Sequence, residues 1–128
     1  MNAELTRWGE PASTVAVQPF GYQVFYKELG SSSVGADETL LLIHGFPESS
    51  FSFHKVVDGL LSHFKRIVLL DLPGYGFSDK PESDYSYSLV PQADAVLAVW
   101  QHLGVKGGHI LSHDMGTSVL TEIVARHV

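Results

Sequence analysis

Apolar and polar positions near the start of the chain alternate over short segments. Residues 14–19 and 22–29 are runs of β-branched and aromatic residues separated by Phe20-Gly21. Two such runs around a glycine-containing turn predict an antiparallel hairpin. The Gly- and Ser-rich stretch 30–38 that follows predicts a surface loop, because it is too short for a domain linker.

From residue 39 onward, continuous apolar runs alternate with amphipathic segments. A continuous run is typical of a strand buried on both faces of a parallel sheet, whereas apolar residues at three- and four-residue steps predict a helix with one buried face. The predicted strands are 39–45, 66–72 and 107–112, and the predicted helices are 50–64, 88–103 and 115–128. The residues expected to face inward on the helices include Val56, Leu97, Trp100, Val119, Leu120, Ile123 and Val124. Strand-then-helix alternation predicts an α/β fold, with the opening hairpin followed by parallel β-α units.

Composition limits the function classes that are open to this chain. It has 128 residues, a formal net charge of −6 and a pI near 5.5. The acidic balance disfavours nucleic acids and anionic membrane surfaces as partners. Without cysteine there is no disulfide framework, thiolate metal site or cysteine nucleophile. The first residues lack the apolar core of a signal peptide and no stretch is long enough to cross a membrane, so we expect a cytoplasmic protein.

The segment 111–116 carries the strongest candidate chemistry. A predicted buried strand ends and a helix begins here within a few residues. A nucleophile elbow holds its nucleophile at the apex of such a turn, in a strained backbone conformation, and needs small residues two positions before and after it. Ser112 and Gly116 meet that need around Asp114. A helix N-terminus favours the ionised carboxylate, which suits covalent attack on an electrophilic carbon.

A second motif bears on how Asp114 is interpreted. Alone, an aspartate before a helix is more often an N-cap than a nucleophile. The segment 44–47, HGFP, follows the first predicted parallel strand, where nucleophile-elbow enzymes supply one backbone N–H of the oxyanion hole, here from Phe46. Met115, directly after the apex, would supply the second. HGFP alone is equally compatible with an ordinary turn, but with the elbow it favours catalysis.

Three motifs together support a family resemblance. HGFP at 44–47, DLPGYGFSDKP at 71–81 and SHDMG at 112–116, in this order and spacing, resemble the N-terminal half of an α/β-hydrolase of the epoxide hydrolase and haloalkane dehalogenase branch. The resemblance covers about residues 14–128. It implies that Asp114 forms an alkyl-enzyme ester with a small hydrophobic substrate, with no cofactor or metal. It also implies supporting roles in the oxyanion loop and elbow for His44, Gly45, Pro47, Ser112, His113 and Gly116.

Two departures from the family pattern refine this expectation. Dehalogenases of this branch typically hold the departing halide with side-chain N–H donors at the positions of Phe46 and Met115, and neither of these side chains can donate. This favours an epoxide hydrolase over a dehalogenase, while an ester hydrolase stays open on fold analogy. In the family, the cap, the acid and the base histidine would lie beyond Val128. His127 is a poor substitute, since it lies roughly 18–20 Å from the elbow at about 1.5 Å per helical residue.

We therefore expect residues 1–128 to form a partial α/β-hydrolase core domain without its cap, acid and catalytic histidine. The alternative is a non-catalytic interaction module. In the isolated 128-residue chain 107–112 would be a bare apolar edge strand, which favours truncation over the module and predicts low solubility and an edge open to self-association. A metal site at His109, His113 and Asp114 is disfavoured because the elbow explains the last two residues better. Gly74 and Gly76 match only half of a dinucleotide-binding motif, so nucleotide binding is disfavoured.

Overall fold

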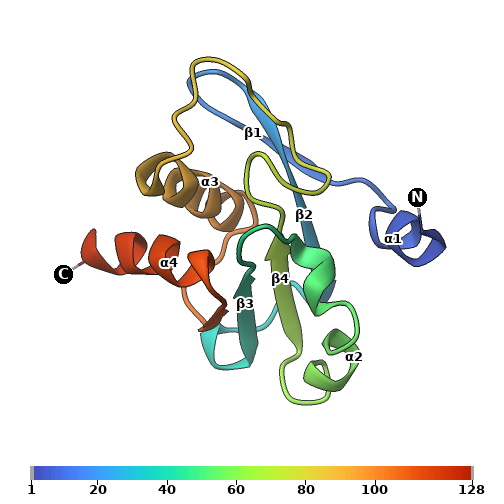
Figure 1. Ribbon diagram of the computed structural model, residues 1–128. Coiled ribbons are helices and arrows are strands. Elements are labelled where there is room, and N and C mark those ends of the chain that lie inside the picture. Colours follow the sequence, from blue (N-terminus) through green and yellow to red (C-terminus); the bar gives the residue numbers. More distant parts are fainter. Residues whose placement is uncertain (1, 128) are drawn as a thin grey trace.

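The computed structural model describes residues 2–127, which form one mixed sheet with helices on both faces (Figure 1). In chain order the elements are α1 (Ala3–Trp8), β1 (Thr14–Val17), β2 (Tyr22–Gly30), the 3-10 turn η1 (Ala36–Glu38), β3 (Thr39–Ile43), the 3-10 turn η2 (Ser50–Phe53), α2 (Val57–Leu60), β4 (Arg66–Leu70), α3 (Leu89–His102), β5 (His109–Ser112) and α4 (Met115–Ala125). No helix within residues 2–127 is long and apolar enough to span a membrane.

The five strands lie in the order β1-β2-β4-β3-β5. β1 and β2 form the predicted antiparallel hairpin, which turns through Gly21 at φ 75°. β2 also pairs antiparallel with β4, whereas β3 pairs parallel with both β4 and β5. The predicted α/β class, with an opening hairpin and a parallel part, is therefore confirmed.

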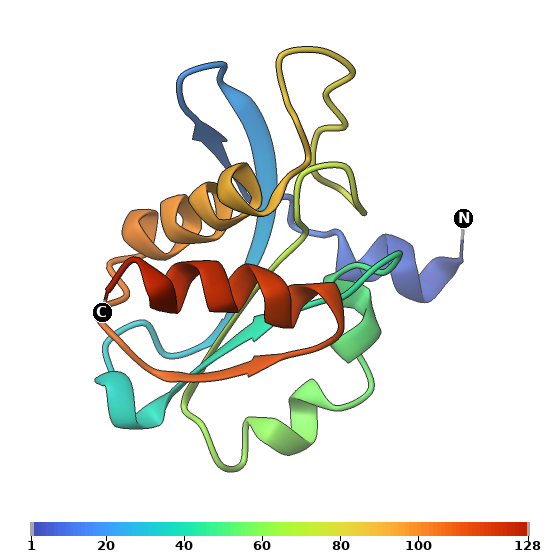
Figure 2. The ribbon, with the colours of Figure 1, turned by 60° about the vertical axis from the view of Figure 1, so that its left-hand side comes forward.

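Successive residues of the central strands pack alternately into two separate hydrophobic cores. Leu41 and Ile43 of β3 belong to the larger core under α3 and α4, whereas Leu40 and Leu42 belong to the core under α1 and α2. Figure 2 shows α3 and α4 side by side on their face of the sheet. Because both faces are covered, every residue of β3 and β4 is buried, as their continuous apolar runs predict.

The predicted helix 50–64 is wrong in its extent. The structure has the 3-10 turn η2 and the one-turn helix α2 in its place. Phe53, Leu60 and Phe64 still pack on the core beneath them. Val56, predicted to face inward, is 50% exposed, because it lies between the two short helices at φ −112° and not on a continuous helical face.

Helices α3 and α4 form where the amphipathic spacing predicts them, but not every predicted residue faces inward. Trp100, Val119 and Ile123 are buried, whereas Leu97 and Leu120 are half-buried. Val124 is 52% exposed, on a helix that packs mainly on α3 and less closely on β3 and β5. The helix ends at Ala125, and the last residue of the prediction, Val128, lies outside the described residues.

The predicted strand at 107–112 is correct in type but wrong in burial. β5 pairs with β3 along one edge, and no described strand lies beyond it. Its residues are consequently exposed or half-buried, with Ile110 at 37% and Leu111 at 46%. The prediction of a bare apolar edge is confirmed for the described part of the chain.

Helix α1 is not predicted by the pattern of the sequence. Asn2 Oδ1 accepts hydrogen bonds from the backbone N–H groups of Glu4 at 2.6 Å and Leu5 at 3.3 Å, which is an N-cap. The indole of Trp8 donates to Ser50 Oγ at 2.9 Å and anchors the helix to η2. An asparagine followed by a short helical segment was the available signal, but six residues are too few to show a period.

Candidate active site

Asp114 occupies a strained position between β5 and α4. The strand ends at Ser112 and the helix begins at Met115, so the chain reverses through two residues. Asp114 takes φ 55° and ψ −122°, a region that non-glycine residues rarely adopt. Such a conformation costs on the order of 1–3 kcal/mol and persists only where the surroundings enforce it. This is the geometry that the small residues around Asp114 predict.

Two glycines allow the turn to pack against the end of β3. A Cβ on Gly116 would lie 2.5 Å from the His44 carbonyl oxygen and 2.7 Å from that of Ile43. A Cβ on Gly45 would lie 2.6 Å from Asp114 Cβ. Any larger residue would push α4 or the loop after β3 away. The side chain of Ser112, on the other side of the apex, shares a 3.0 Å hydrogen bond with Thr117 Oγ1.

The carboxylate of Asp114 is exposed and faces backbone donors. The N–H of Phe46 donates to its Oδ2 at 3.1 Å, across 68 residues of sequence. The side chain makes no N-cap hydrogen bond to α4, so the geometry of an ordinary cap is not observed. The N–H groups of Met115 and Phe46 hold the pKa of Asp114 below its ordinary value. The carboxylate is thus ionised at neutral pH.

His44 ties the loop of Phe46 to the neighbouring strand. It is buried, its Nδ1 faces the Gly45 carbonyl oxygen at 2.9 Å, and its Nε2 accepts from the Leu72 N–H at 2.9 Å. These partners require a proton on Nδ1 and none on Nε2, which is the neutral imidazole. Burial lowers the pKa of His44 and favours the same form. Both ring nitrogens are therefore engaged in holding the loop.

Asp71 is a structural centre that the sequence reasoning missed. Fully buried at the end of β4, it accepts the Ser50 N–H on Oδ1 at 2.7 Å and the Phe77 N–H on Oδ2 at 2.8 Å. One carboxylate thereby fixes both the segment after HGFP and the loop 73–81. The signal was an acidic residue within the otherwise apolar run 66–72. This anchoring makes the loop a fixed part of the site.

Aromatic and charged side chains surround the elbow. Phe46 is 61% exposed, and its ring lies edge-on to Tyr75 at a centroid distance of 6.3 Å. Tyr75 in turn packs against His44 at 5.5 Å, which leaves an apolar wall beside the carboxylate. His113 is exposed, with its Nδ1 3.3 Å from Glu48 Oε1. The Phe46–Pro47 peptide bond is cis.

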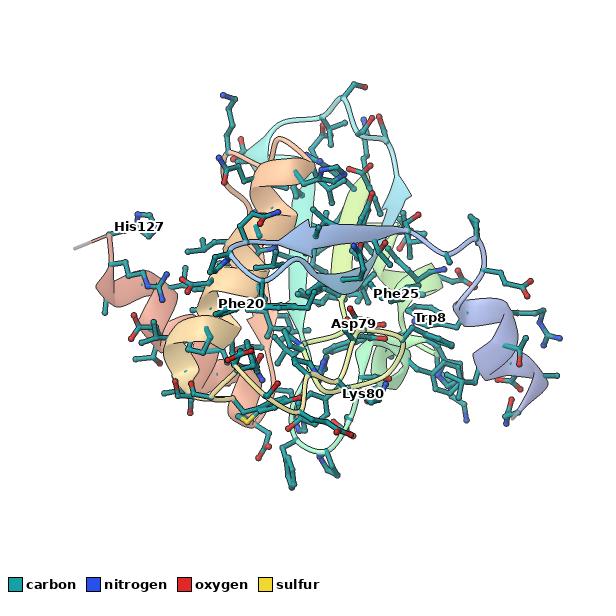
Figure 3. All side chains as sticks on the ribbon, turned by 90° about the horizontal axis from the view of Figure 1, so that it is seen from above. Trp8, Phe20, Phe25, Asp79, Lys80 and His127 are labelled. Atoms are coloured by element: carbon teal, nitrogen blue, oxygen red, sulfur yellow. The ribbon has the colours of Figure 1, made fainter. Side chains whose placement is uncertain are left out.

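Two other histidines considered in the sequence analysis lie apart from Asp114. His109 packs its ring against Phe64 at 5.4 Å, on the α2 face of the sheet. Within residues 2–127, no three His, Asp or Glu side chains are arranged to hold a metal ion. Figure 3 shows His127 at the far end of α4, on the outside of the molecule. The structure thus brings together the loop of Phe46, the turn at Asp114 and the buried His44, and separates His127 from them.

The model of the alpha/beta hydrolase fold family matches residues 38–128. The chain belongs to this family. It is 42% identical over 108 residues to the mesoderm-specific transcript homolog protein of Bos taurus, a match that covers 83% of this chain and 32% of that protein. The chain thus spans about a third of the length of the curated relatives it matches.

Solved structures of hydrolases share this fold. An epoxide hydrolase from Vigna radiata superposes with a TM-score of 0.71 at 33% identity, over 84% of this chain and 33% of that one. A haloalkane dehalogenase loop variant from Bradyrhizobium elkanii superposes with a TM-score of 0.76 at 31% identity, over 90% of this chain and 35% of that one. The predicted resemblance to the branch that contains both enzymes is therefore confirmed.

Proposed function

We propose that this chain supplies the nucleophile and the oxyanion hole of an epoxide-opening hydrolase that works through an ester on Asp114. The observation that carries the proposal is the pose of the carboxylate. Asp114 is exposed at the apex of the strand-to-helix turn, and its Oδ2 already accepts the N–H of Phe46 at 3.1 Å. The side chain makes no hydrogen bond that caps α4, although the Met115 N–H lies close enough to lower its pKa.

The first step is attack by Oδ1 on an epoxide carbon. Its electron pair forms the new C–O bond while the ring C–O bond breaks, and the departing oxygen takes a proton from solvent water to become a hydroxyl group. The lowered pKa of Asp114 keeps the nucleophile ionised. The exposed ring of Phe46 and the half-buried ring of Tyr75 form an apolar wall suited to a small hydrophobic epoxide.

The second step is hydrolysis of that ester by water. Oδ2 is then the ester carbonyl oxygen, so water adding to this carbon places negative charge on the atom that the Phe46 N–H holds. The Met115 N–H, which also lowers the pKa of Asp114, would be the second donor. Collapse of the tetrahedral intermediate releases the diol and restores the carboxylate.

The hydrolytic step needs a base that accepts the proton of water. His44 is neutral, but its nitrogens are occupied by the Gly45 carbonyl and the Leu72 N–H. His127 lies at the opposite end of α4 (Figure 3). We assign water activation to a group outside the described residues, and we expect the 128-residue chain to form the ester and hydrolyse it slowly.

Intact-mass spectrometry after incubation with styrene oxide tests the proposal. The expected result is a gain of one epoxide mass per chain, mapped to the peptide that contains Asp114 and persisting for hours. Asp114→Asn should abolish it. Asp84→Asn is the matched control, since Asp84 is also an exposed aspartate at positive φ, at 63°, but lies in a loop away from the elbow. Equal labelling of the Asp114→Asn chain, or no labelling with any epoxide, would leave the non-catalytic interaction module as the better reading.

Haloalkanes distinguish this chemistry from dehalogenation. The side chains of Phe46 and Met115 offer no N–H to a departing halide. Incubation with 1-bromobutane should therefore label Asp114 far more slowly than styrene oxide does. Comparable rates would favour a dehalogenase.

A further inference from the structure

Helix α1 packs against the segment that follows the Phe46 loop. The indole N–H of Trp8 donates to Ser50 Oγ at 2.9 Å, and Ser50 is buried. The Trp8 ring also lies edge-on to Phe51, with ring centroids 6.1 Å apart. Figure 3 shows Trp8 on the side of α1 that faces the rest of the molecule. Trp8 therefore connects α1 to η2.

A lysine of β2 fixes the position of the Trp8 ring. Lys27 Nζ donates to the Trp8 carbonyl oxygen at 2.9 Å and lies 4.8 Å from the centroid of the Trp8 ring. This is a cation–π contact, in which an ammonium group is attracted to the face of an indole. The carbonyl, the ring and the indole N–H of Trp8 are thus all engaged with other elements, which gives the side chain a fixed orientation.

The residue after Trp8 contacts a second loop of the site. Gly9 is buried, and a Cβ added to it would lie 2.6 Å from Phe77 Cζ. The N–H of Phe77 donates to Asp71 Oδ2 at 2.8 Å, and Asp71 Oδ1 accepts the Ser50 N–H at 2.7 Å. The pair Trp8-Gly9 therefore contacts both segments that the Asp71 carboxylate holds.

The chain between Phe46 and Ser50 is short and closely folded. Ser50 follows Phe46 by only four residues. The N–H of Glu48 donates to the Gly45 carbonyl oxygen at 2.9 Å, which closes a turn over the residues between them. The hydrogen bond from the Ser50 N–H to Asp71 fixes a distance but leaves rotation about it open. The second bond, from the indole N–H to Ser50 Oγ, restricts that rotation.

We propose that Trp8 is a positioning residue that, through Ser50, holds the Phe46 N–H against the carboxylate of Asp114. The hydrogen bond that it supports is the 3.1 Å contact from the Phe46 N–H to Asp114 Oδ2. Phe46 is 61% exposed, so its own side chain does little to keep this N–H in place. The consequence for catalysis rests on the proposed function, because only an ester on Asp114 would need this donor. The effect on the hydrogen bond itself does not depend on that function.

The pKa of Asp114 reports whether the Phe46 N–H is in place. The N–H groups of Met115 and Phe46 hold that pKa below its ordinary value, with a further contribution from the charge of His113. Met115 and His113 belong to the elbow and not to the segment that Trp8 contacts. A variant that loosens only the Phe46 N–H should therefore move the titration of Asp114 to higher pH. Carboxyl 13C NMR measures this midpoint without any substrate.

Trp8→Phe and Trp100→Phe are a matched pair of variants. Trp8→Phe keeps an aromatic ring and removes the N–H that Ser50 accepts. Trp100→Phe removes an indole N–H that has no hydrogen-bond partner within residues 2–127, on a side chain of the larger core. Both should lower the free energy of unfolding, but only Trp8→Phe should raise the Asp114 midpoint. It should also slow labelling by styrene oxide about twofold to tenfold, the range that one neutral hydrogen bond accounts for.

Ser50→Ala removes the other end of the same hydrogen bond. The variant loses the Oγ acceptor but keeps the backbone N–H that Asp71 accepts. It should reproduce the higher Asp114 midpoint of Trp8→Phe, and the double variant should show no larger change than either single one, because both remove one interaction.

Three outcomes would overturn the proposal. The first is an Asp114 midpoint that is unchanged in both Trp8→Phe and Ser50→Ala. The second is an equal rise in Trp100→Phe, which would make the effect a general result of lost stability, and the third is additive changes in the double variant. If wild-type chains take up no epoxide, the proposed function fails, whereas the NMR midpoints still decide whether Trp8 positions the Phe46 N–H.

Discussion

Replacing Gly116 by alanine tests whether the elbow is held by close packing of α4 against β3. The new Cβ would lie 2.5 Å and 2.7 Å from the carbonyl oxygens of His44 and Ile43, whereas ordinary contact begins at 3.4 Å. The nearest gap must therefore widen by 3.4 − 2.5 = 0.9 Å. Both obstructing atoms are backbone, so no side-chain rotation relieves the overlap. The helix itself must move.

The size of the effect follows from two opposing contributions. Forcing an extra carbon into a packed site costs about 1–3 kcal/mol. Replacing glycine by alanine in a helix contributes about 0.5–1 kcal/mol in the stabilising direction. We expect a net loss of up to about 2.5 kcal/mol in the free energy of unfolding, which lowers the urea midpoint by up to about 1.5 M. Labelling of Asp114 by styrene oxide should slow as well, because α4 carries Met115 and the turn.

Gly59→Ala is the matched control. Gly59 is helical in α2, and a Cβ there would meet nothing within 4 Å. This variant should gain up to about 1 kcal/mol, since it receives the helix contribution without the clash. Urea unfolding followed by the fluorescence of Trp8 and Trp100, at one fixed protein concentration, compares the two. If Gly116→Ala were as stable as Gly59→Ala, the close-packing explanation of the elbow would be wrong.

Three further predictions concern the buried polar groups. Asp71→Asn should lower the free energy of unfolding by about 2–4 kcal/mol, because an amide loses the charge and can accept only one of the two backbone N–H groups well; equal urea midpoints would contradict this. Arg66→Met should lower the free energy of unfolding by about 3 kcal/mol. The reason is that it leaves the carboxylate of Glu28, which accepts from Arg66 Nε at 2.7 Å, without its charged partner. The double variant with Glu28→Leu should lose less than that single one, and an equal or larger loss would count against the buried ion pair. Burial holds the pKa of His44 below its ordinary 6.5, so the folded chain binds a proton on His44 more weakly than the unfolded chain does. The free energy of unfolding should therefore fall as the pH drops below about 6.5. Imidazole 15N shifts check this, and a His44 midpoint at or above 6.5 would refute it.

The fold was predictable where local pattern and tertiary burial agree. The runs at 39–45 and 66–72 are apolar without interruption at 40–43 and 67–70, and the structure covers both faces of β3 and β4. The segment 107–112 was predicted to be a buried strand of the same kind, yet β5 is exposed because it lies at the edge of the described sheet. The predicted helix 50–64 failed for another reason, since a correct apolar stripe is compatible with two short helices as well as with one long one.

The sequence by itself determined the family and the positions of the candidate chemistry. HGFP and SHDMG are local motifs, and the need for small residues at Gly45 and Gly116 is imposed by atoms within a few ångströms of the turn. Their roles in catalysis stay predictions until the labelling experiment is done.

Only the tertiary structure decided which groups meet. The hydrogen bond from Phe46 to Asp114 spans 68 residues, and Asp71 joins the loops of Ser50 and Phe77. It also decided that Val124 faces outward and that β5 is left open. The physical reason is that residue spacing along the chain sets a side chain's direction within its own element, whereas its neighbours depend on how the strands are ordered in the sheet.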